Sequence, residues 1–341
     1  MPNLAIRIKF IVLSRSIMAL SLNDIKKIID PELIEFEKRF KASVKGDTPL
    51  LNIIMQYIIK RKGKQMRPML VMLAAKLKGE VTEATYVGAS LVELLHTATL
   101  VHDDVVDDSY KRRGFLSINA LWRNKIAVLV GDFLLAKGLL ISIENEQYKL
   151  LKVLSDTIRE MSEGELLQLE KARKLDIKED IYFNIIRQKT ASLIASACKC
   201  GAISVGASEN EVEQLRLIGE KIGIAFQMKD DLLDFADSET GKPKGIDIKE
   251  RKMTLPLIYT LSKVDCDMRR KIIFIVKNEN TNPEKVQWVI DVIKQNGGIT
   301  YTEEIMKDYV IKAHRLLNEF DESEARKAFH DIIDFVITRK S

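Results

Sequence analysis

The sequence predicts an all-α protein that folds as one large helical bundle. The chain has 341 residues, of which 46% are hydrophobic and 30% charged, which is typical of a globular protein with a sizeable core. It contains only seven prolines, and no alternating run of polar and apolar residues is long enough to indicate a β-strand. From Ser21 onward the chain reads as helices that short breaks separate.

The breaks are rich in residues that end helices or form turns, and we expect about ten or more helices between them. They lie at the Pro31 region and at residues 46–49, 63–68, 79–82, 109–114, 174–179, 208–210, 238–245, 278–283 and 297–298. No change in composition marks a second domain and no solenoid-type repeat is present. We therefore expect residues 21–341 to form a single all-helical domain.

Residues 1–20 differ from the rest of the chain. They carry Arg7, Lys9 and Arg15, and no acidic residue occurs before Asp24. The longest apolar run, residues 10–13, is too short for a secretory signal sequence or a membrane span. We expect either a basic, disordered tail or translation from a start codon upstream of the usual one, which would be Met18. Both are favoured over a targeting segment. We expect no other segment to cross a bilayer.

A predicted apolar helix, which begins with Thr82 as its N-cap, has four carboxylates at its C-terminal end. Residues 91–101, LVELLHTATLV, contain a single acid and predict a mostly buried segment. At helical spacing two pairs of acids then share faces, Asp103 with Asp107 and Asp104 with Asp108. Such pairs repel each other by roughly a few tenths of a kcal/mol when exposed, and more when water is removed. A divalent cation would remove this repulsion.

A second acidic cluster follows the apolar residues 222–226 and reads FQMKDDLLDF. Its acids are Asp230, Asp231 and Asp234, and the first and last of them are one helical turn apart. Carboxylates at two helix ends are the hard oxygen ligands that hold Mg²⁺ while the ion keeps water and phosphate oxygens. Solvated acidic helix faces are the alternative. They fit less well, because both clusters interrupt apolar stretches and share the same spacing.

The two clusters resemble the aspartate-rich motifs of a known family. HDDVVDDSYKRRG and FQMKDDLLDF are similar to the first and second motifs of the trans-isoprenyl diphosphate synthases, or polyprenyl synthetase family. Further matching segments are GKQMRP from Gly63, LLHTATLVHDD from Leu94, GD at Gly131, QKTASL from Gln188 and GKPKGIDIKERKMTLPLIY from Gly241. The resemblance is dense over residues 50–260. It implies a helical bundle of the isoprenoid synthase type with a central cavity.

The resemblance also implies a ligand set for magnesium, about three ions per site once substrate is bound. The implied metal ligands are Asp103, Asp104, Asp107, Asp230, Asp231 and Asp234. The implied catalytic residues are Asp103, Asp107, Asp230, Lys189 and Gln227. His102 is expected to support the aspartates, and Asp247 to contact metal-bound water.

Basic and polar residues are expected to hold two diphosphate substrates. By resemblance, Arg112 contacts the allylic diphosphate and Arg113 the isopentenyl diphosphate, and both side chains suit bidentate phosphate binding. The isopentenyl diphosphate site is implied to contain Lys64, Arg67 and His96, although His96 alone reads equally well as a core histidine. The other implied substrate-binding residues are Lys189, Thr190, Gln227, Lys242 and Lys252. Arg339 and Lys340 are candidates to fold over the site.

The implied reaction is ionisation, condensation and elimination, repeated with successive isopentenyl diphosphates on a farnesyl or geranylgeranyl type primer. The growing chain is expected to run back along the first helix past Thr99, Ala98 and Leu95, which precede Asp103 by four, five and eight positions. Because the first two side chains are small, we expect a long product between hexaprenyl and decaprenyl, with octaprenyl the best estimate. Its expected use is in quinone side chains. Residues 133–140 are candidates for the tunnel floor.

Two other functions stay open: a noncatalytic or partner-dependent subunit of a two-component synthase, and a terpene cyclase. Both aspartate motifs are present, which disfavours both alternatives. The formal net charge of +5 is modest and no clustered basic stripe indicates nucleic-acid binding. Three cysteines without metal-site spacing fit a reducing compartment, and we expect a cytoplasmic protein. We also expect a homodimer, with the apolar residues 126–140 as one candidate face, and transient membrane contact during product release.

Overall fold

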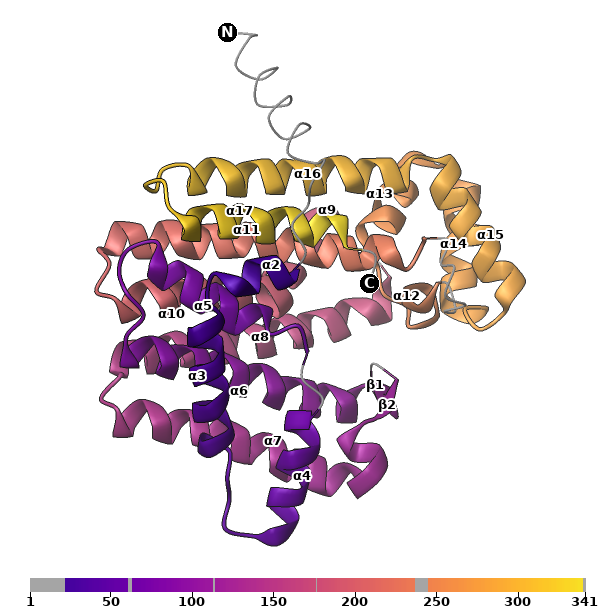
Figure 1. The fold of residues 1–341 in the computed structure, drawn as a ribbon. Coiled ribbons are helices and arrows are strands. Elements are labelled where there is room, and N and C mark those ends of the chain that lie inside the picture. Colours follow the sequence, from indigo (N-terminus) through magenta and orange to yellow (C-terminus); the bar gives the residue numbers. More distant parts are fainter. Residues whose placement is uncertain (1–21, 61–62, 113, 176, 237–244, 340–341) are drawn as a thin grey trace, which may run out of the picture.

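Long helices lie side by side and form nearly all of the regular structure (Figure 1). The computed structural model describes residues 22–60, 63–112, 114–175, 177–236 and 245–339. The expected N-terminal extension and the predicted residues Arg113, Lys242 and Lys340 lie outside the described residues. The prediction of an all-α helical bundle is confirmed for the part of the chain that the structure describes.

The helices follow one another through short connections. They are α2 (Leu22–Lys27), α3 (Asp30–Ser43), α4 (Pro49–Lys60), α5 (Met66–Lys76), α6 (Glu83–Val106), α7 (Ile118–Glu144), α8 (Tyr148–Lys174), α9 (Glu179–Ile186), the π-helical turn η1 (Arg187–Ala191), α10 (Ser192–Ser204), α11 (Glu209–Leu233), α12 (Ile246–Lys249), α13 (Leu255–Lys263), α14 (Cys266–Asn278), α15 (Pro283–Gln295), α16 (Gly298–Leu317) and α17 (Glu324–Thr338). Among the described residues the strands are β1 (Lys111–Arg112) and β2 (Phe115–Leu116), which pair antiparallel.

Helices α6 and α11 both begin with capping boxes. The Thr82 side chain accepts a hydrogen bond from the backbone N–H of Thr85 at 3.3 Å, which confirms the predicted N-cap. Ser208 accepts one from the N–H of Glu211 at 3.4 Å, and the Glu211 carboxylate accepts one from the Ser208 N–H at 2.9 Å. The C-terminal ends of both helices lie on the side of the bundle that carries β1, β2 and α12 (Figure 1).

Two clusters of buried side chains form the core. The larger one joins the inner faces of most helices and includes Leu95 of α6. The smaller one lies between α4, α6 and α7 and includes Ala98, Val130 and Leu134. Helix α6 contributes to both clusters, which explains why its sequence is apolar over most of its circumference.

Several helix boundaries differ from those expected. The chain turns at residues 145–147 without glycine or proline, because Glu146 adopts a positive φ of 55°. The expected break at the Pro31 region is present at residues 28–29, between α2 and α3, and Pro31 itself lies in the first turn of α3, where a proline sacrifices no hydrogen bond. The expected loop at residues 109–114 contains β1 and turns at Gly114, whose φ is 82°.

Helices α6 and α7 are long and apolar enough to cross a membrane by length and composition, so the expectation that no segment could do so is wrong by that criterion. Within residues 126–143 of α7 the only charged residues are Asp132 and Lys137. The most apolar window of α6 is 56% buried inside the protein, whereas that of α7 is 33% buried. Helix α7 therefore presents an apolar outer face, which includes Leu129 at 64% exposure.

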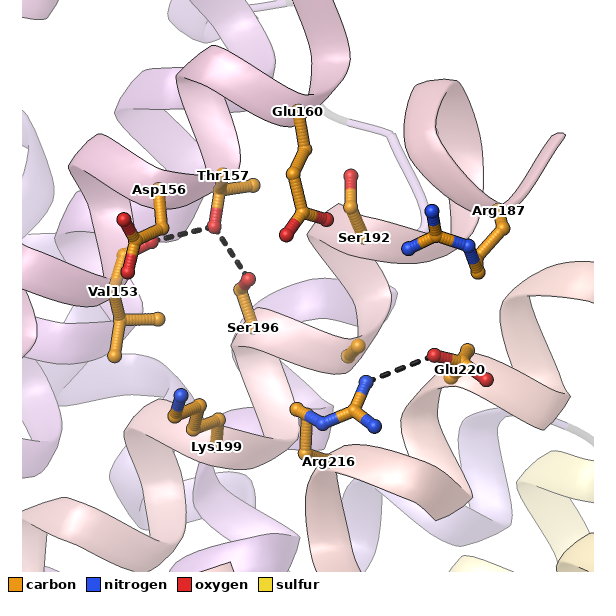
Figure 2. Close-up of a pocket in the computed structure, with 11 residues that line it drawn as sticks. Val153, Asp156, Thr157, Glu160, Arg187, Ser192, Ser196, Lys199, Arg216 and Glu220 are labelled. Atoms are coloured by element: carbon orange, nitrogen blue, oxygen red, sulfur yellow. Dashed lines mark hydrogen bonds and ion pairs between the residues drawn. The ribbon is translucent and has the colours of Figure 1, made fainter. Parts of the chain in front are cut away.

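A small polar hollow of about 90 Å³ lies between α8, η1, α10 and α11 (Figure 2). Thr157 and Ser196 share a hydrogen bond of 2.5 Å across it, and Arg216 donates to Glu220 at 2.8 Å. The charges that line it balance, because three basic side chains are matched by three carboxylates. None of the predicted site residues lines this hollow.

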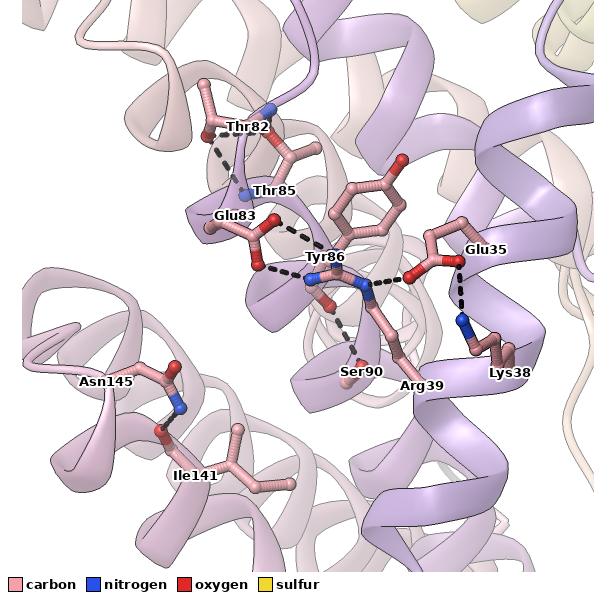
Figure 3. A network of polar contacts seen from close by, with 10 residues as sticks. All are labelled: Glu35, Lys38, Arg39, Thr82, Glu83, Thr85, Tyr86, Ser90, Ile141 and Asn145. Carbon is pink, nitrogen blue, oxygen red and sulfur yellow. Dashed lines mark hydrogen bonds and ion pairs between the residues drawn. The ribbon is translucent and has the colours of Figure 1, made fainter.

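Arg39 joins α3 to the start of α6 (Figure 3). Its Nε donates to Glu35 at 2.7 Å, and its terminal nitrogens donate to both carboxylate oxygens of Glu83. The guanidinium also lies over the Tyr86 ring, 4.4 Å from the ring centroid. Because Glu83 is largely exposed, we assign this network to orienting α3, with a small contribution to stability.

Candidate functional site

The second acidic cluster begins with Asp230 near the end of α11. Arg339, directly after α17, donates a hydrogen bond of 2.6 Å to its carboxylate. The guanidinium also stacks on the Phe226 ring at 3.9 Å. Burial raises the pKa of Asp230, while the charges of Arg339 and Lys64 counteract that rise. The structure thus places the C-terminal Arg339, a candidate to fold over the site, on a predicted metal ligand.

Asp231 is buried and both of its carboxylate oxygens accept hydrogen bonds. Tyr182 of α9 donates to Oδ2 at 2.6 Å, and Gln227 donates to Oδ1 at 2.9 Å. Thr190 of η1 in turn donates to the amide oxygen of Gln227 at 2.8 Å. Burial raises the pKa of Asp231, and these two hydrogen bonds partly offset the effect by stabilising the carboxylate.

Asp234 ties α12 to the end of α11. Its two carboxylate oxygens accept hydrogen bonds from the backbone N–H groups of Ile246 and Asp247, at 2.9 and 3.0 Å. The first turn of a helix leaves such N–H groups without intrahelical partners, so a carboxylate is well suited to bind them. In the structure Asp234 therefore anchors the segment that follows residues 237–244.

Lys252 interacts electrostatically with an acid of the first cluster and with an acid beside the second. Its amino group lies 2.5 Å from a carboxylate oxygen of Glu250 and 4.0 Å from one of Asp247. Burial alone would lower the pKa of Lys252, but its contact with Glu250 and the charges of Asp247 and Asp107 raise it. Asp107 belongs to the first cluster and Asp247 packs against the second. One lysine therefore lies within electrostatic reach of both.

Asp247 itself is largely shielded from water. Burial raises its pKa well above the ordinary range, and the nearby charges of Asp231 and Asp234 raise it further. Several carboxylates in a partly dry space need cations to remain ionised together. The second cluster therefore has the electrostatic character of a cation-binding site.

The first cluster lies at the end of α6. Asp103 is half-buried, Asp104 is 4% exposed, and Asp107 is exposed and follows the last helical residue. The hairpin that carries Arg112 comes directly afterwards, and Ser117 holds its base by donating to the carbonyl of Ser109 at 2.6 Å. The predicted allylic-site residue Arg112 therefore lies in β1, four positions after Asp108.

A hollow of about 220 Å³ lies between α8, α9, η1, α11, α12 and the segment that follows α12. Several of the predicted site residues line it. The predicted residues that line it are Lys189, Thr190, Gln227, Asp231, Asp247 and Lys252. Ile177, Ile185, Ile186 and Met253 supply apolar walls. The hollow therefore combines cationic and amide groups with a water-excluding surface.

Three residues of this site were not predicted from the sequence: Tyr182, Glu165 and Gln168. Glu165 forms an ion pair with Lys189, and Gln168 accepts a hydrogen bond from the same lysine at 3.5 Å. Both residues belong to α8. The apolar residues of α8 recur at helical spacing between polar ones, as in any amphipathic surface helix. Nothing in that pattern distinguishes a pocket-facing glutamate from a solvated one.

Other predicted residues do not line this hollow. Lys64 lies with its amino group 5.3 Å from the Phe335 ring centroid, and its charge acts on Asp230 from that side. Arg67 and His96 are half-buried. Leu95 and Ala98 are fully buried and Thr99 is half-buried, with its hydroxyl donating to the His96 carbonyl at 2.9 Å.

His102 packs against α7, which fixes the position of the first cluster. Its Nε2 lies 3.3 Å from the Val128 carbonyl oxygen and 3.4 Å from a carboxylate oxygen of Asp132. Both neighbours accept hydrogen bonds, so Nε2 carries the proton. Gly131 makes this approach possible, because a Cβ there would lie 2.1 Å from His102 Nε2. Gly131 thus has a steric role, whereas Asp132 contributes its carboxylate to the His102 ring.

Gly131→Ala is expected to destabilise the protein by about 1 to 3 kcal/mol, because the new methyl group must displace the His102 ring. The double variant His102→Ala with Gly131→Ala is expected to regain most of that loss, since the clashing ring is gone. Urea unfolding of the two variants and of His102→Ala alone measures the effect. Equal stability of Gly131→Ala and the double variant would contradict the steric role.

The described residues contain no group of three or more His, Cys, Asp or Glu side chains arranged to hold a metal ion by themselves. The two clusters nevertheless offer only oxygen donors, and Asp103, Asp107 and Asp230 lie at helix ends without being fully buried. This donor set fits Mg²⁺, which takes one or two carboxylates and completes its shell with water and substrate phosphates.

Comparisons with known proteins identify the family. The family model for polyprenyl synthetases matches residues 48–293. The chain is 36% identical to a short chain isoprenyl diphosphate synthase of Methanothermobacter thermautotrophicus, over 89% of this chain and 95% of the relative. It is 32% identical to an octaprenyl diphosphate synthase of Escherichia coli, over 94% of this chain and 99% of the relative.

The fold comparison gives the same result. A crystal structure of a polyprenyl synthase from Caulobacter crescentus, complexed with calcium and isoprenyl diphosphate, matches with a TM-score of 0.88 and 31% identity. The match covers 95% of this chain and 99% of that one. This chain therefore belongs to the polyprenyl synthetase family, the trans-isoprenyl diphosphate synthases, and is a prenyltransferase with the all-α isoprenoid synthase fold.

Proposed function

We propose that this prenyltransferase is a magnesium-dependent synthase that condenses an allylic diphosphate with successive isopentenyl diphosphates to a long all-trans polyprenyl diphosphate. The observation that carries the proposal is the position of Lys252. Its amino group lies 4.0 Å from a carboxylate oxygen of Asp247, beside the second cluster, and also feels the charge of Asp107 of the first cluster. Two acidic helix ends that share one lysine provide the charge pattern for binding a diphosphate through divalent cations.

The chain's own residues have distinct tasks in the proposed reaction. Lys189 and Lys252 attract the diphosphate oxygens and keep the departing group in place. The apolar side chains of the hollow exclude water, which would otherwise capture an allylic cation. Gln227 presents an amide oxygen on the same side as Thr190, where it stabilises positive charge on the allylic carbon.

Asp103, Asp107 and Asp230 are the residues that would hold magnesium, with Asp104, Asp231 and Asp234 beside them. When bound, the metal supplies Lewis-acid stabilisation of the negative charge that builds up on the leaving diphosphate. No described histidine lines the hollow. In line with the family resemblance, we assign removal of the final proton to the released diphosphate and not to a protein base.

Long products follow from the side chains at Ala98 and Thr99, which leave more room beside α6 than aromatic residues would. Octaprenyl diphosphate is the proposed product, within a range from hexaprenyl to decaprenyl. The primer is proposed to be of the farnesyl or geranylgeranyl type. Use of the product in quinone side chains and a cytoplasmic location stay predictions.

A homodimer is proposed through the apolar outer face of α7. This face, which lies after the kink at Arg123, exposes Val128, Leu129, Leu139, Leu140 and Ile143 to between 41% and 64%. An exposed apolar stripe of this length on one helix favours burial against a second copy. Sedimentation analysis should then give twice the mass of one chain. Transient membrane contact during product release is proposed on the chemistry of the product alone.

Activity of the purified full-length chain tests the proposed function. Farnesyl diphosphate, labelled isopentenyl diphosphate and Mg²⁺ are expected to give a labelled long-chain prenyl diphosphate, resolved by chromatography after dephosphorylation. Addition of EDTA is expected to abolish product, and Mg²⁺ in excess to restore it. Hydrocarbon products from the allylic substrate alone would indicate a cyclase. Activity that appears only with a second polypeptide would indicate a two-component synthase subunit.

A further inference from the structure

A line of three hydrogen bonds connects four side chains at the wall of the hollow. Tyr182 donates to Asp231 Oδ2 at 2.6 Å, Gln227 donates to Asp231 Oδ1 at 2.9 Å, and Thr190 donates to Gln227 Oε1 at 2.8 Å. Tyr182 and Asp231 are each 4% exposed. The outer end of the line, Thr190 and Gln227, belongs to the proposed binding site, whereas no role has been assigned to Tyr182.

The direction of these bonds fixes the orientation of the Gln227 amide. An ionised carboxylate only accepts hydrogen bonds, so Gln227 must turn its NH₂ group to Asp231 and its oxygen to Thr190. Rotation of the Asp231 carboxylate would release the amide. Tyr182 prevents this, because its hydroxyl holds the second carboxylate oxygen. Its ring is itself confined in the core, edge-on to Phe183 at 5.4 Å between centroids.

The π-helical turn explains how Tyr182 and Thr190 reach the same line. They are eight residues apart, which would place them about 80° apart around an uninterrupted α-helix. Between them lies η1, where i→i+5 hydrogen bonds widen one turn and admit an additional residue. The extra residue lets Thr190 reach Gln227 while Tyr182 reaches Asp231. Such π-turns occur frequently at functional sites.

We infer that Tyr182 is a positioning residue of the prenyl transfer reaction: it locks Asp231, which in turn holds the Gln227 oxygen toward the allylic carbon. The inference rests on the proposed function and extends it to a residue outside the aspartate motifs. A fixed dipole aimed at developing charge accelerates ionisation because it needs no reorganisation. Loss of the lock therefore affects the chemical step more than substrate binding.

Tyr182→Phe removes only the hydroxyl and is the direct test. We expect kcat to fall about tenfold, with the KM of both substrates changed by less than about twofold, because the lock acts on the transition state. Tyr301→Phe is the matched control. Tyr301 also donates a tyrosine hydroxyl to a carboxylate, at 2.8 Å to Glu179, and thereby anchors the same helix α9 away from the hollow. We expect its kcat to stay near that of the unchanged chain.

A double-mutant cycle separates positioning from general loosening of α9. If Tyr182 acts through Gln227, combining Tyr182→Phe with Gln227→Leu should lower kcat little further than Gln227→Leu alone. Multiplication of the two separate effects would overturn the inference, as would equal losses in Tyr182→Phe and Tyr301→Phe. Inactivity of the unchanged chain would instead refute the proposed function. An active chain with an unaffected Tyr182→Phe variant would refute only the role of Tyr182.

Discussion

Asp230→Asn should lower kcat at least about a hundredfold, which corresponds to about 3 kcal/mol of transition-state stabilisation. Asp230 is the acid of the second cluster that is 42% exposed, and it lies where a cation can replace the guanidinium of Arg339. Asparagine keeps an oxygen that can accept from Arg339, so the local packing is retained. Rates of labelled isopentenyl incorporation at saturating substrates and Mg²⁺ measure the loss. Asp103→Ala is expected to have a similarly large effect.

The control for Asp230→Asn is Asp321→Asn, which changes an exposed acid in the turn before α17 and should leave the rate unchanged. Thermal unfolding of each variant establishes that the fold is intact. Binding of Mn²⁺ and inorganic diphosphate, followed by calorimetry, provides a reading independent of turnover. If Asp230→Asn kept near-normal activity, Asp230 would have to be removed from the metal site.

Ala98→Phe should shorten the product without abolishing turnover. Ala98 is fully buried on α6, five positions before Asp103, in the cluster between α4, α6 and α7. A benzyl group there narrows the path along which the prenyl tail would extend, so elongation stops earlier while the reacting groups are untouched. Chromatography of the dephosphorylated products against prenyl alcohol standards measures the length. The extra volume is also expected to cost about 1 to 3 kcal/mol of stability.

A graded series separates tunnel length from general overpacking. Ala98→Leu should give products between those of the unchanged chain and of Ala98→Phe. Ala313→Leu enlarges an equally buried alanine on α16 and should reduce stability without changing product length. An unchanged distribution of products in both Ala98 variants would refute the assignment of the tunnel to this face of α6.

The family resemblance lies in short segments whose chemistry is local. Asp103 and Asp107 are placed together by helical periodicity, and the same holds for Asp230 and Asp234, so their spacing is readable directly from the chain. The cap at Thr82 is equally local, because a side-chain oxygen and an N–H group three residues later form it. These features required no knowledge of how distant helices pack.

Long-range partners were not readable in the same way. Tyr182 meets Asp231, a residue 49 positions later, and Arg339 meets Asp230 across 109 positions. The role of Gly131 depends on the His102 ring of another helix. The π-helical turn η1 also lacks a local sequence mark, although it decides which way Lys189 and Thr190 face.

The sequence by itself therefore determined the fold class and the acidic clusters, which depend on helical period and on neighbours within one or two turns, and its motifs carried the resemblance to the family. Only the tertiary structure decided which partners these acidic and basic side chains contact. It gave Asp231 a hydrogen bond from Tyr182, gave Asp234 one from the backbone of α12, and brought Lys252 within reach of the charges of Asp107 and Asp247. The physical reason is that hydrogen bonds and burial between distant helices depend on packing angles and side-chain reach, which no local pattern encodes.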